Sequence, residues 1–377
     1  MDSAPPQAGP VQHEPATEET KASELSLAAA EPAFKTRGSG DIFDWKERER
    51  REDGTFSWGE SLSEEDLEGS PRGLARPSSS SSSRDSDVGS RCAYVTFLCD
   101  DSEYWKGAVV LGKSLRATGC RYPLIVAVMK GVSSKLRQLL ADQHGCIVRE
   151  IEDVAPPPGA EKVVRRPYYL TQYTKLRIWQ FDDFDKLTYL DSDMLVLQNL
   201  DYLFDMLPSD QIMGVKNCFC VGWKNHPRVC GTAYCQFDPV KHPWTFPEGK
   251  PEPTPYINAG FFVFAPSRAV FAQMQHALAA FPASELAEQD FLNDFWAGRI
   301  RTLPPENNLL LNFLFSHPDL LDLDNAALIH FAVAGSKPWA YDPSMPDMTH
   351  PDVVRFVKMW QKLYAEDEST YKPAAGA

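Results

Sequence analysis

The sequence predicts an α/β protein with one open, doubly wound sheet, preceded by a long segment without a core. Between residues 92 and 152, apolar runs of strand length alternate with segments of helical spacing. A pair of aspartates follows a later buried run, at the kind of position where open α/β sheets bind ligands. Residues 1–90 are instead rich in Pro, Ala, Glu and Ser, and they end near a run of serines. Such a composition buries too little apolar surface to offset chain entropy.

Size and charge narrow the classes of protein to consider. The chain has 377 residues, of which 43% are hydrophobic and 11% aromatic, and its formal net charge is −14. Acidic groups spread along the chain argue against nucleic acid or an anionic membrane surface as the main partner. No apolar run reaches the ~20 residues that span a bilayer, and the first residues lack the basic start and apolar stretch of a secretory signal. We therefore expect a cytoplasmic protein whose eight cysteines are reduced thiols.

Composition divides the chain into three parts. We expect a disordered acidic leader at 1–90, a folded domain at 91–365 and a flexible tail at 366–377. One stretch of the leader, 41–58, places four aromatic residues around a charged run. It is either a docking segment that folds on a partner or a solvated linker, and the surrounding composition favours the linker.

The first half of the folded domain alternates strands with helices. Apolar runs predict buried strands at 92–100, 122–130 and 146–152, and helical spacing predicts helices at 104–119 and 133–145. This order predicts a Rossmann-like parallel sheet with helices on both faces. No Gly-x-Gly-x-x-Gly follows the first strand, which argues against a NAD cofactor.

The second half continues with the same two kinds of element. The predicted elements, in chain order, are a helix at 171–184, a buried strand ending at Leu190, a strand at 257–267, helices at 267–281 and 285–298, and a strand within 327–339 that leads into a turn. No internal repeat is present. The sequence therefore predicts a single domain.

Asp191 and Asp193 follow directly after the buried run Thr188–Leu190. Strands avoid aspartate, and a buried unpaired charge is costly, so a partner must compensate these carboxylates. Carboxylates at a strand end suit Mg²⁺ or Mn²⁺, and either ion also contacts substrate phosphates. The alternative is a polar turn that caps a helix. The hydrophobic residues on both sides of the pair favour the metal site.

A second group of candidates lies in the stretch HFAVAGSKPW. His330 has a neutral imidazole that binds metals, although a histidine taken alone is more often a satisfied core residue. Gly335 permits close approach of the backbone to a phosphate, and Lys337 is a mobile cation suited to phosphate oxygens. The proximity of the glycine and the lysine favours a ligand-binding role for the whole stretch.

Two polar segments suggest contacts with a hydroxylated ligand. Glu288, Gln289 and Asp290 lie near a predicted helix start, where they either bind sugar hydroxyls or cap the helix. An amide and two small residues at the start of the strand at 257–267 offer a floor for the ligand, or they are an ordinary strand start.

Four cysteines lie within 18 residues of one another, at Cys218, Cys220, Cys230 and Cys235. They are a possible zinc site. Their spacing is not the Cys-x₂-Cys pair typical of such sites, so packing thiols are the favoured interpretation.

Together, these motifs resemble the glycogenin-related, retaining nucleotide-sugar glycosyltransferases. The resemblance covers about residues 92–365 and rests on YVTFL, YTKLRIW, YLDSDMLVLQNLDYLFD, NAGFFVFAPS, EQDFLN and HFAVAGSKPW. It implies a single nucleotide-sugar-binding domain of the glycosyltransferase A type, with a mixed central sheet. Within the family, AEQDFLN and AGSKPW are most similar to the galactinol synthases. No tyrosine occurs between Tyr256 and Tyr341, where glycogenin carries its self-glucosylated tyrosine.

The resemblance also implies a reaction and its residues. The implied reaction carries galactose from UDP-galactose to myo-inositol with Mn²⁺ or Mg²⁺ as cofactor, and Asp191, Asp193 and His330 are the implied metal ligands. The implied catalytic residues are Asp191, Asp193, Gln289, Asp290 and Lys337. The implied nucleotide-sugar-binding residues are Thr96, Phe97, Tyr104, Lys175, Asn258, Ala259, Gly260, Gly335 and Lys337.

Two other functions stay open. A glycogenin-like or protein-directed transferase would use UDP-glucose or UDP-galactose with the same residues. A degenerate nucleotide-sugar sensor would have lost metal or phosphate ligands, and the presence of Asp191, Asp193, His330 and Lys337 argues against it. The sequence leaves the oligomeric state open.

Overall fold

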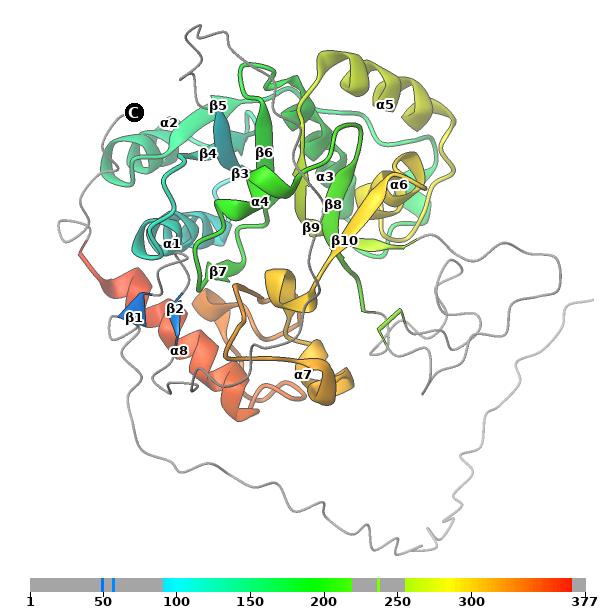
Figure 1. The fold of residues 1–377 in the computed structure, drawn as a ribbon. Coiled ribbons are helices and arrows are strands. Elements are labelled where there is room, and N and C mark those ends of the chain that lie inside the picture. Colours follow the sequence, from blue (N-terminus) through cyan, green and yellow to red (C-terminus); the bar gives the residue numbers. More distant parts are fainter. Residues whose placement is uncertain (1–48, 51–55, 58–90, 219–235, 238–254, 368–377) are drawn as a thin grey trace, which may run out of the picture. The chain divides into compact units, whose positions relative to one another are not determined.

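The computed structural model describes residues 49–50, 56–57, 91–218, 236–237 and 255–367 (Figure 1). Within the predicted leader it describes only β1 (Glu49–Arg50) and β2 (Phe56–Ser57), which pair antiparallel. The rest of the leader, most of the possible docking segment, three of the four clustered cysteines and residues 368–377 of the predicted C-terminal tail lie outside the described residues.

The centre of the folded domain is a seven-stranded mixed sheet. In pairing order its strands are β10 (Ile300–Leu303), β8 (Ile212–Lys216), β9 (Ile257–Phe264), β6 (Lys186–Leu190), β3 (Cys92–Leu98), β4 (Leu124–Val128) and β5 (Ile147–Glu150). The four strands from β6 to β5 are parallel, as the alternation of strands and helices predicts. Strand β9 runs antiparallel to both of its neighbours. The mixed sheet confirms the predicted fold class.

Eight helices accompany the strands in the described part of the chain. They are α1 (Tyr104–Ala117), α2 (Ser134–Gln138), α3 (Tyr169–Gln172), α4 (Tyr202–Met206), α5 (Arg268–Ala280), α6 (Glu288–Phe295), α7 (Phe313–Ser316) and α8 (Pro351–Ala365). A π-helical turn at Leu139–Gln143 extends α2, and 3₁₀ turns occupy Ala160–Lys162, Tyr173–Gln180, Pro305–Asn308, Pro318–Leu320 and Pro338–Ala340. None of the described helices is both long enough and apolar enough to cross a bilayer.

One predicted helix has a different geometry. The residues at 171–184 form the end of α3 and then a 3₁₀ segment, Tyr173–Gln180, rather than one α-helix. Most side chains of this segment are buried, Lys175 among them. Because it is enclosed on several sides, packing rather than intrinsic propensity sets its geometry.

Two hydrophobic cores cover the two faces of the central sheet. Successive residues of a strand point to opposite faces, so in β3 Tyr94 belongs to the core under α1 and Val95 belongs to the core under α5 and α6. In Figure 1, α1 and α8 lie on one side of the sheet, and α5 and α6 lie on the other. This packing holds the carboxyl ends of the parallel strands at a fixed edge.

A second, three-stranded sheet completes that edge. It pairs β11 (Leu309–Leu310) with β12 (Leu328–His330), and β12 in turn pairs antiparallel with β7 (Met194–Val196). In this register His330 lies opposite Met194. A strand from late in the chain therefore reaches the aspartate pair that follows β6.

Candidate active site

The acidic pair lies between two strands that belong to different sheets. Asp191 follows β6, and its backbone N–H donates to the carbonyl of Gly260 in β9 over 2.8 Å. Asp193 precedes β7, and its carbonyl accepts from the backbone N–H of Phe331 over 2.9 Å. Backbone bonds to two neighbouring segments thus fix both aspartates.

His330 completes a cluster with the two aspartates. Its Nε2 lies 3.3 Å from Oδ1 of Asp193 and 4.0 Å from Oδ2 of Asp191. One ligand atom from each of the three residues lies within 4.8 Å of the others. The structure therefore brings together the three predicted metal ligands.

A glycine makes room for this cluster. A Cβ added to Gly260 would lie 2.5 Å from Cε1 of His330 and 2.7 Å from Oδ2 of Asp191. Real Cβ atoms do not approach other atoms so closely. Two carboxylates and an imidazole held in a cradle that excludes a methyl group form a donor set that suits Mn²⁺ or Mg²⁺.

Lys337 supplies a positive charge next to Asp193. Its Nζ forms an ion pair with Oδ2 of Asp193 and donates to the carbonyl of Phe331 over 2.5 Å. Burial by itself would raise the pKa of Asp193, but the Lys337 ammonium and His330 outweigh it and hold that pKa below its ordinary value. Asp193 is therefore an anionic oxygen donor.

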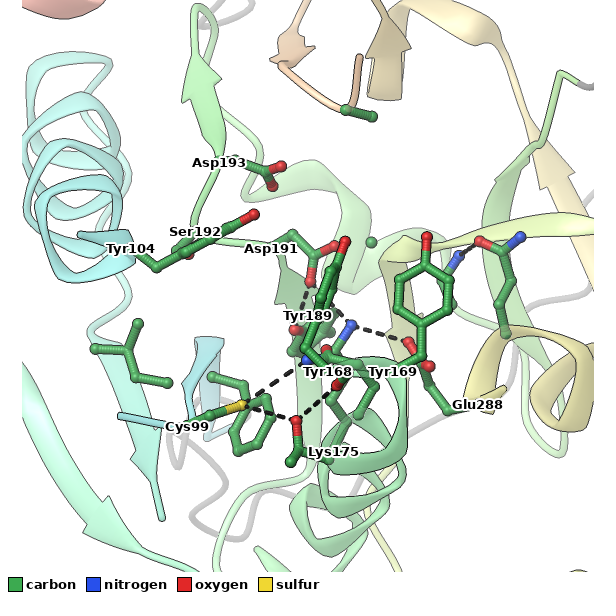
Figure 2. A pocket seen from close by; sticks show the side chains of 18 of the residues that line it. Cys99, Tyr104, Tyr168, Tyr169, Lys175, Tyr189, Asp191, Ser192, Asp193 and Glu288 are labelled. Carbon is green, nitrogen blue, oxygen red and sulfur yellow. Dashed lines mark hydrogen bonds and ion pairs between the residues drawn. The ribbon is translucent and has the colours of Figure 1, made fainter. Parts of the chain in front are cut away.

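Lys175 anchors Asp191 from the other side. Its buried Nζ lies 3.1 Å from Oδ1 of Asp191 and 3.1 Å from Oε1 of Glu288, and Figure 2 shows it between these two carboxylates. The hydroxyl of Tyr189 donates to the same Asp191 oxygen over 2.6 Å. Oδ1 of Asp191 thus has two partners, and Oδ2 is the oxygen nearer to His330.

Burial shapes the electrostatics of this anchor. Burial by itself lowers the pKa of Lys175, yet Asp191, Tyr189 and Glu288 together raise it well above its ordinary value. Burial raises the pKa of Glu288, against the opposing effect of Lys175. The lysine is therefore charged at neutral pH and serves as the shared counterion of two carboxylates.

A pocket of about 340 Å³ opens onto these groups. Most of the residues predicted to bind the nucleotide sugar or to act in catalysis line it. They are Phe97, Tyr104, Lys175, Asp191, Asp193, Asn258, Ala259, Gly260, Gln289, His330 and Lys337. The pocket has both polar walls and aromatic rings, a combination suited to a ligand that carries charge, hydroxyls and a planar base.

Three predicted site residues do not line this pocket. Thr96 is fully buried in β3. Asp290 is also buried; its carboxylate accepts from the hydroxyl of Tyr256 over 2.7 Å and from the backbone N–H of Leu286 over 3.2 Å. Gly335 has a φ of +83°, and an added Cβ would meet Met345 at 2.8 Å, so glycine is needed there for the turn.

Sequence reasoning missed several residues of the site. Tyr168 and Tyr169 line the pocket and pack edge to face, with ring centroids 4.8 Å apart. The adjacent tyrosines that precede the YTKLRIW motif were the available signal. Glu288 was weighed only as a cap or a sugar contact, and its pairing with Lys175 joins positions 113 residues apart, which no local pattern reveals.

The cysteine interpretation is only partly covered by the structure. Cys218 is buried, and its Sγ lies 3.4 Å from Nε2 of His317. The other three cysteines of the cluster lie outside the described residues. A zinc site at these positions stays an untested alternative.

Comparison with known proteins identifies relatives of this chain. The model of Glycosyl transferase family 8 matches residues 95–342, a range that contains the whole Asp191, Asp193 and His330 cluster. Galactinol synthase 7 of Arabidopsis thaliana is 40% identical over 285 residues, which cover 76% of this chain and 85% of the relative. Galactinol synthase 2 of Solanum lycopersicum is 40% identical over 280 residues, 74% of this chain and 82% of the relative.

A solved structure shares the fold. An active-site mutant of LgtC superposes with a TM-score of 0.50 at 19% identity, covering 72% of this chain and 94% of that chain. At this identity the likeness concerns the fold alone.

Proposed function

The chain belongs to glycosyl transferase family 8 and is a glycosyltransferase, and from this premise we propose that it transfers galactose from UDP-galactose to myo-inositol with retention of configuration, in a metal-dependent reaction. The observation that carries the proposal is the name shared by its relatives. Those at about 40% identity are galactinol synthases, and this chain covers more than four fifths of their length. The donor set in the pocket agrees with that chemistry.

The metal site of this proposal uses Asp191, Asp193 and His330. Their oxygen and nitrogen donors fit Mn²⁺ or Mg²⁺, and a side chain at position 260 would collide with His330 and Asp191. When bound, the ion neutralises negative charge on the departing diphosphate. Lys175 and Tyr189 hold Asp191 in place for this role.

Lys337 is the proposed cation for the phosphates. In the structure its ammonium is paired with Asp193 at the pocket wall. A cation held by the aspartates would replace the lysine as counterion of Asp193, and Lys337 would then be available to phosphate oxygens. Such a charge placed where negative charge develops lowers the barrier for departure of UDP.

The remaining pocket residues divide between base and sugar. We assign Phe97 and Tyr104 to the uridine, because they supply rings and apolar surface. Asn258 and Gln289 present amides that suit sugar hydroxyls. Retention requires the acceptor hydroxyl to be held against the face from which UDP leaves, and the pocket must position both ligands together.

Product analysis tests the proposal. Purified protein with UDP-galactose, Mn²⁺ and myo-inositol is expected to release UDP in an inositol-dependent manner and to form an α-galactoside, which NMR of the product identifies. Asp193→Asn is the matched inactive variant, because it is isosteric and removes one anionic ligand.

Two outcomes contradict the proposal in different ways. UDP release that other polyols support and inositol does not would reject the acceptor. Transfer from UDP-glucose onto the protein itself, without added acceptor, would favour a glycogenin-like reaction instead.

A further inference from the structure

Behind His330, three amide side chains from separate segments form one continuous hydrogen-bonded network: Asn308 is fully buried, and Asn258 and Gln289 are half-buried at the pocket wall. Nδ1 of His330 lies 3.2 Å from Oδ1 of Asn308. Nδ2 of Asn308 donates to Oδ1 of Asn258 over 3.2 Å. Nδ2 of Asn258 in turn donates to Oε1 of Gln289 over 3.2 Å. This hydrogen-bonded network links His330, a candidate metal ligand, to Gln289 in the pocket wall.

Backbone groups fix the direction of this network. The N–H of Gly260 donates to Oδ1 of Asn258 over 3.1 Å, and the N–H of Ala259 donates to Oε1 of Gln289 over 3.0 Å. A backbone N–H can only donate, so the atoms that face these groups must be oxygens. The orientations of the Asn258 and Gln289 amides therefore do not depend on an arbitrary choice between O and N.

The far end of the network agrees with this direction. Nε2 of Gln289 donates to the hydroxyl of Tyr256 over 3.3 Å, and that hydroxyl donates to Oδ1 of Asp290 over 2.7 Å. An ionised carboxylate only accepts. Every link from Asp290 back to Asn258 is thus consistent with one arrangement of donors and acceptors.

The direction determines which nitrogen of His330 carries hydrogen. Because Asn258 presents an oxygen, Asn308 must turn its NH₂ group toward it, which leaves Oδ1 of Asn308 facing Nδ1 of His330. Nδ1 must then be the N–H nitrogen. In the neutral ring, Nε2 is left with a lone pair. That lone pair faces carboxylate oxygens of Asp193 at 3.3 Å and Asp191 at 4.0 Å, an arrangement of electron donors that a cation stabilises.

We propose that Asn308 is a positioning residue for metal binding: it holds His330 as the Nδ1–H tautomer and directs Nε2 toward Asp191 and Asp193. Asn308 is fully buried at the end of the 3₁₀ turn Pro305–Asn308, which directly precedes β11. The inference rests on the metal site of the proposed function. It also gives Asp290, which does not line the pocket, a role as the fixed end of the network.

A pair of neighbouring asparagines provides the test. Asn307 is buried in the same 3₁₀ turn. Its Oδ1 accepts a hydrogen bond from the hydroxyl of Tyr202, and it is not a member of the hydrogen-bonded amide network behind His330. The experiment compares Mn²⁺ binding among wild type, Asn308→Ala and Asn307→Ala, each as the whole 377-residue protein with UDP present. The EPR signal of free Mn²⁺ measures the binding. Asn308→Ala is expected to weaken Mn²⁺ binding by about tenfold or more, the range typical of partners behind a metal ligand, and Asn307→Ala is expected to leave it near the wild-type value.

A second measurement observes the His330 ring directly in the wild-type protein. The imidazole ¹⁵N spectrum of metal-free wild type, recorded at alkaline pH, reports the tautomer, and comparison with His330→Gln assigns the signal. The Nδ1–H form supports the proposal, and the Nε2–H form overturns it. Equal Mn²⁺ affinity for Asn308→Ala and Asn307→Ala also overturns it, whereas absence of Mn²⁺ binding by wild type would overturn the metal site of the proposed function instead.

Discussion

Asp193 and Lys337 form an ion pair that joins two parts of the site 144 residues apart in the chain. The carboxylate is buried and the ammonium is partly exposed on the pocket side. Removing only one partner of a buried pair leaves an uncompensated charge. In the proposed reaction the same ammonium binds phosphate oxygens. Lys337 would therefore pair with Asp193 in the ligand-free protein and with the phosphates of UDP-galactose in the complex.

Replacing Lys337 therefore tests its role in turnover. Lys337→Ala is expected to lower kcat/KM for UDP-galactose by about 100-fold or more, the usual effect of losing one preorganised charge partner of a transition state. Steady-state kinetics at several donor concentrations measure it. Lys358→Ala, an exposed lysine on α8, is the control, and a similar loss in both variants would contradict the specific role.

Gly260 tests the space around the cluster. Gly260→Ala places a methyl group against His330 and Asp191, so it is expected to abolish Mn²⁺ binding and inositol-dependent UDP release. Mn²⁺ titration and the activity assay measure this, and circular dichroism controls for folding. A folded Gly260→Ala protein with normal Mn²⁺ affinity would show that the cluster is not the metal site.

At the residue scale, the sequence indicated the clustered side chains better than the residues that support them. Asp191 and Asp193 were identifiable because carboxylates directly after an apolar run suit a metal, and the family resemblance added His330. Asn308 carried no such signal, because an asparagine that follows two prolines and precedes an apolar run is also an ordinary turn residue. Its contact with His330 exists only once β11 and β12 pair.

At the scale of elements, α5 links a local sequence signal to the site. Its N-cap, Ser267, accepts from the backbone N–H of Val270 over 3.4 Å, and the helix packs on the segment that carries Lys175. Ser267→Ala is expected to lower the free energy of unfolding by about 1 kcal/mol. Denaturant unfolding measures it.

A second substitution at Ser267 tests whether the loss of stability comes from the lost helix cap. Ser267→Asp restores a capping acceptor next to the positive end of the helix, so its stability should return to near the wild-type value. Failure of the aspartate to restore stability would mean that the hydroxyl matters for some other reason. Neither change is expected to alter Mn²⁺ affinity, because Ser267 lies outside the pocket lining.

The sequence predicted those helices and strands that have long hydrophobic patterns. Strands β3, β4 and β9 and helices α1 and α5 follow apolar runs or helical spacing over many residues. Strand β7 has three residues and β11 has two, too few to show a period. Because these short strands build the second sheet, the sequence did not indicate how His330 reaches the aspartates.

At the scale of the whole molecule, the proposed metal site joins two sheets. Asp191 follows β6 of the central sheet, and His330 ends β12 of the small sheet. A ligand that binds only the folded state stabilises it by mass action, about 2.7 kcal/mol when its concentration is 100 times Kd. For a domain of this size each kcal/mol corresponds to roughly 2–4 °C, so Mn²⁺ with UDP is expected to raise Tm by about 5–10 °C.

Variants make that thermal shift diagnostic. Asp191→Asn removes an anionic ligand without changing side-chain size, so most of the Mn²⁺-dependent shift is expected to disappear relative to the variant's own Tm. Asp142→Asn, an exposed aspartate in the π-helical turn, should keep the full shift. Since the two variants change the net charge equally, a shift lost in both would indicate general electrostatic screening, and a shift kept in both would place the ion elsewhere. Only loss confined to Asp191→Asn supports a cation held where the two sheets meet.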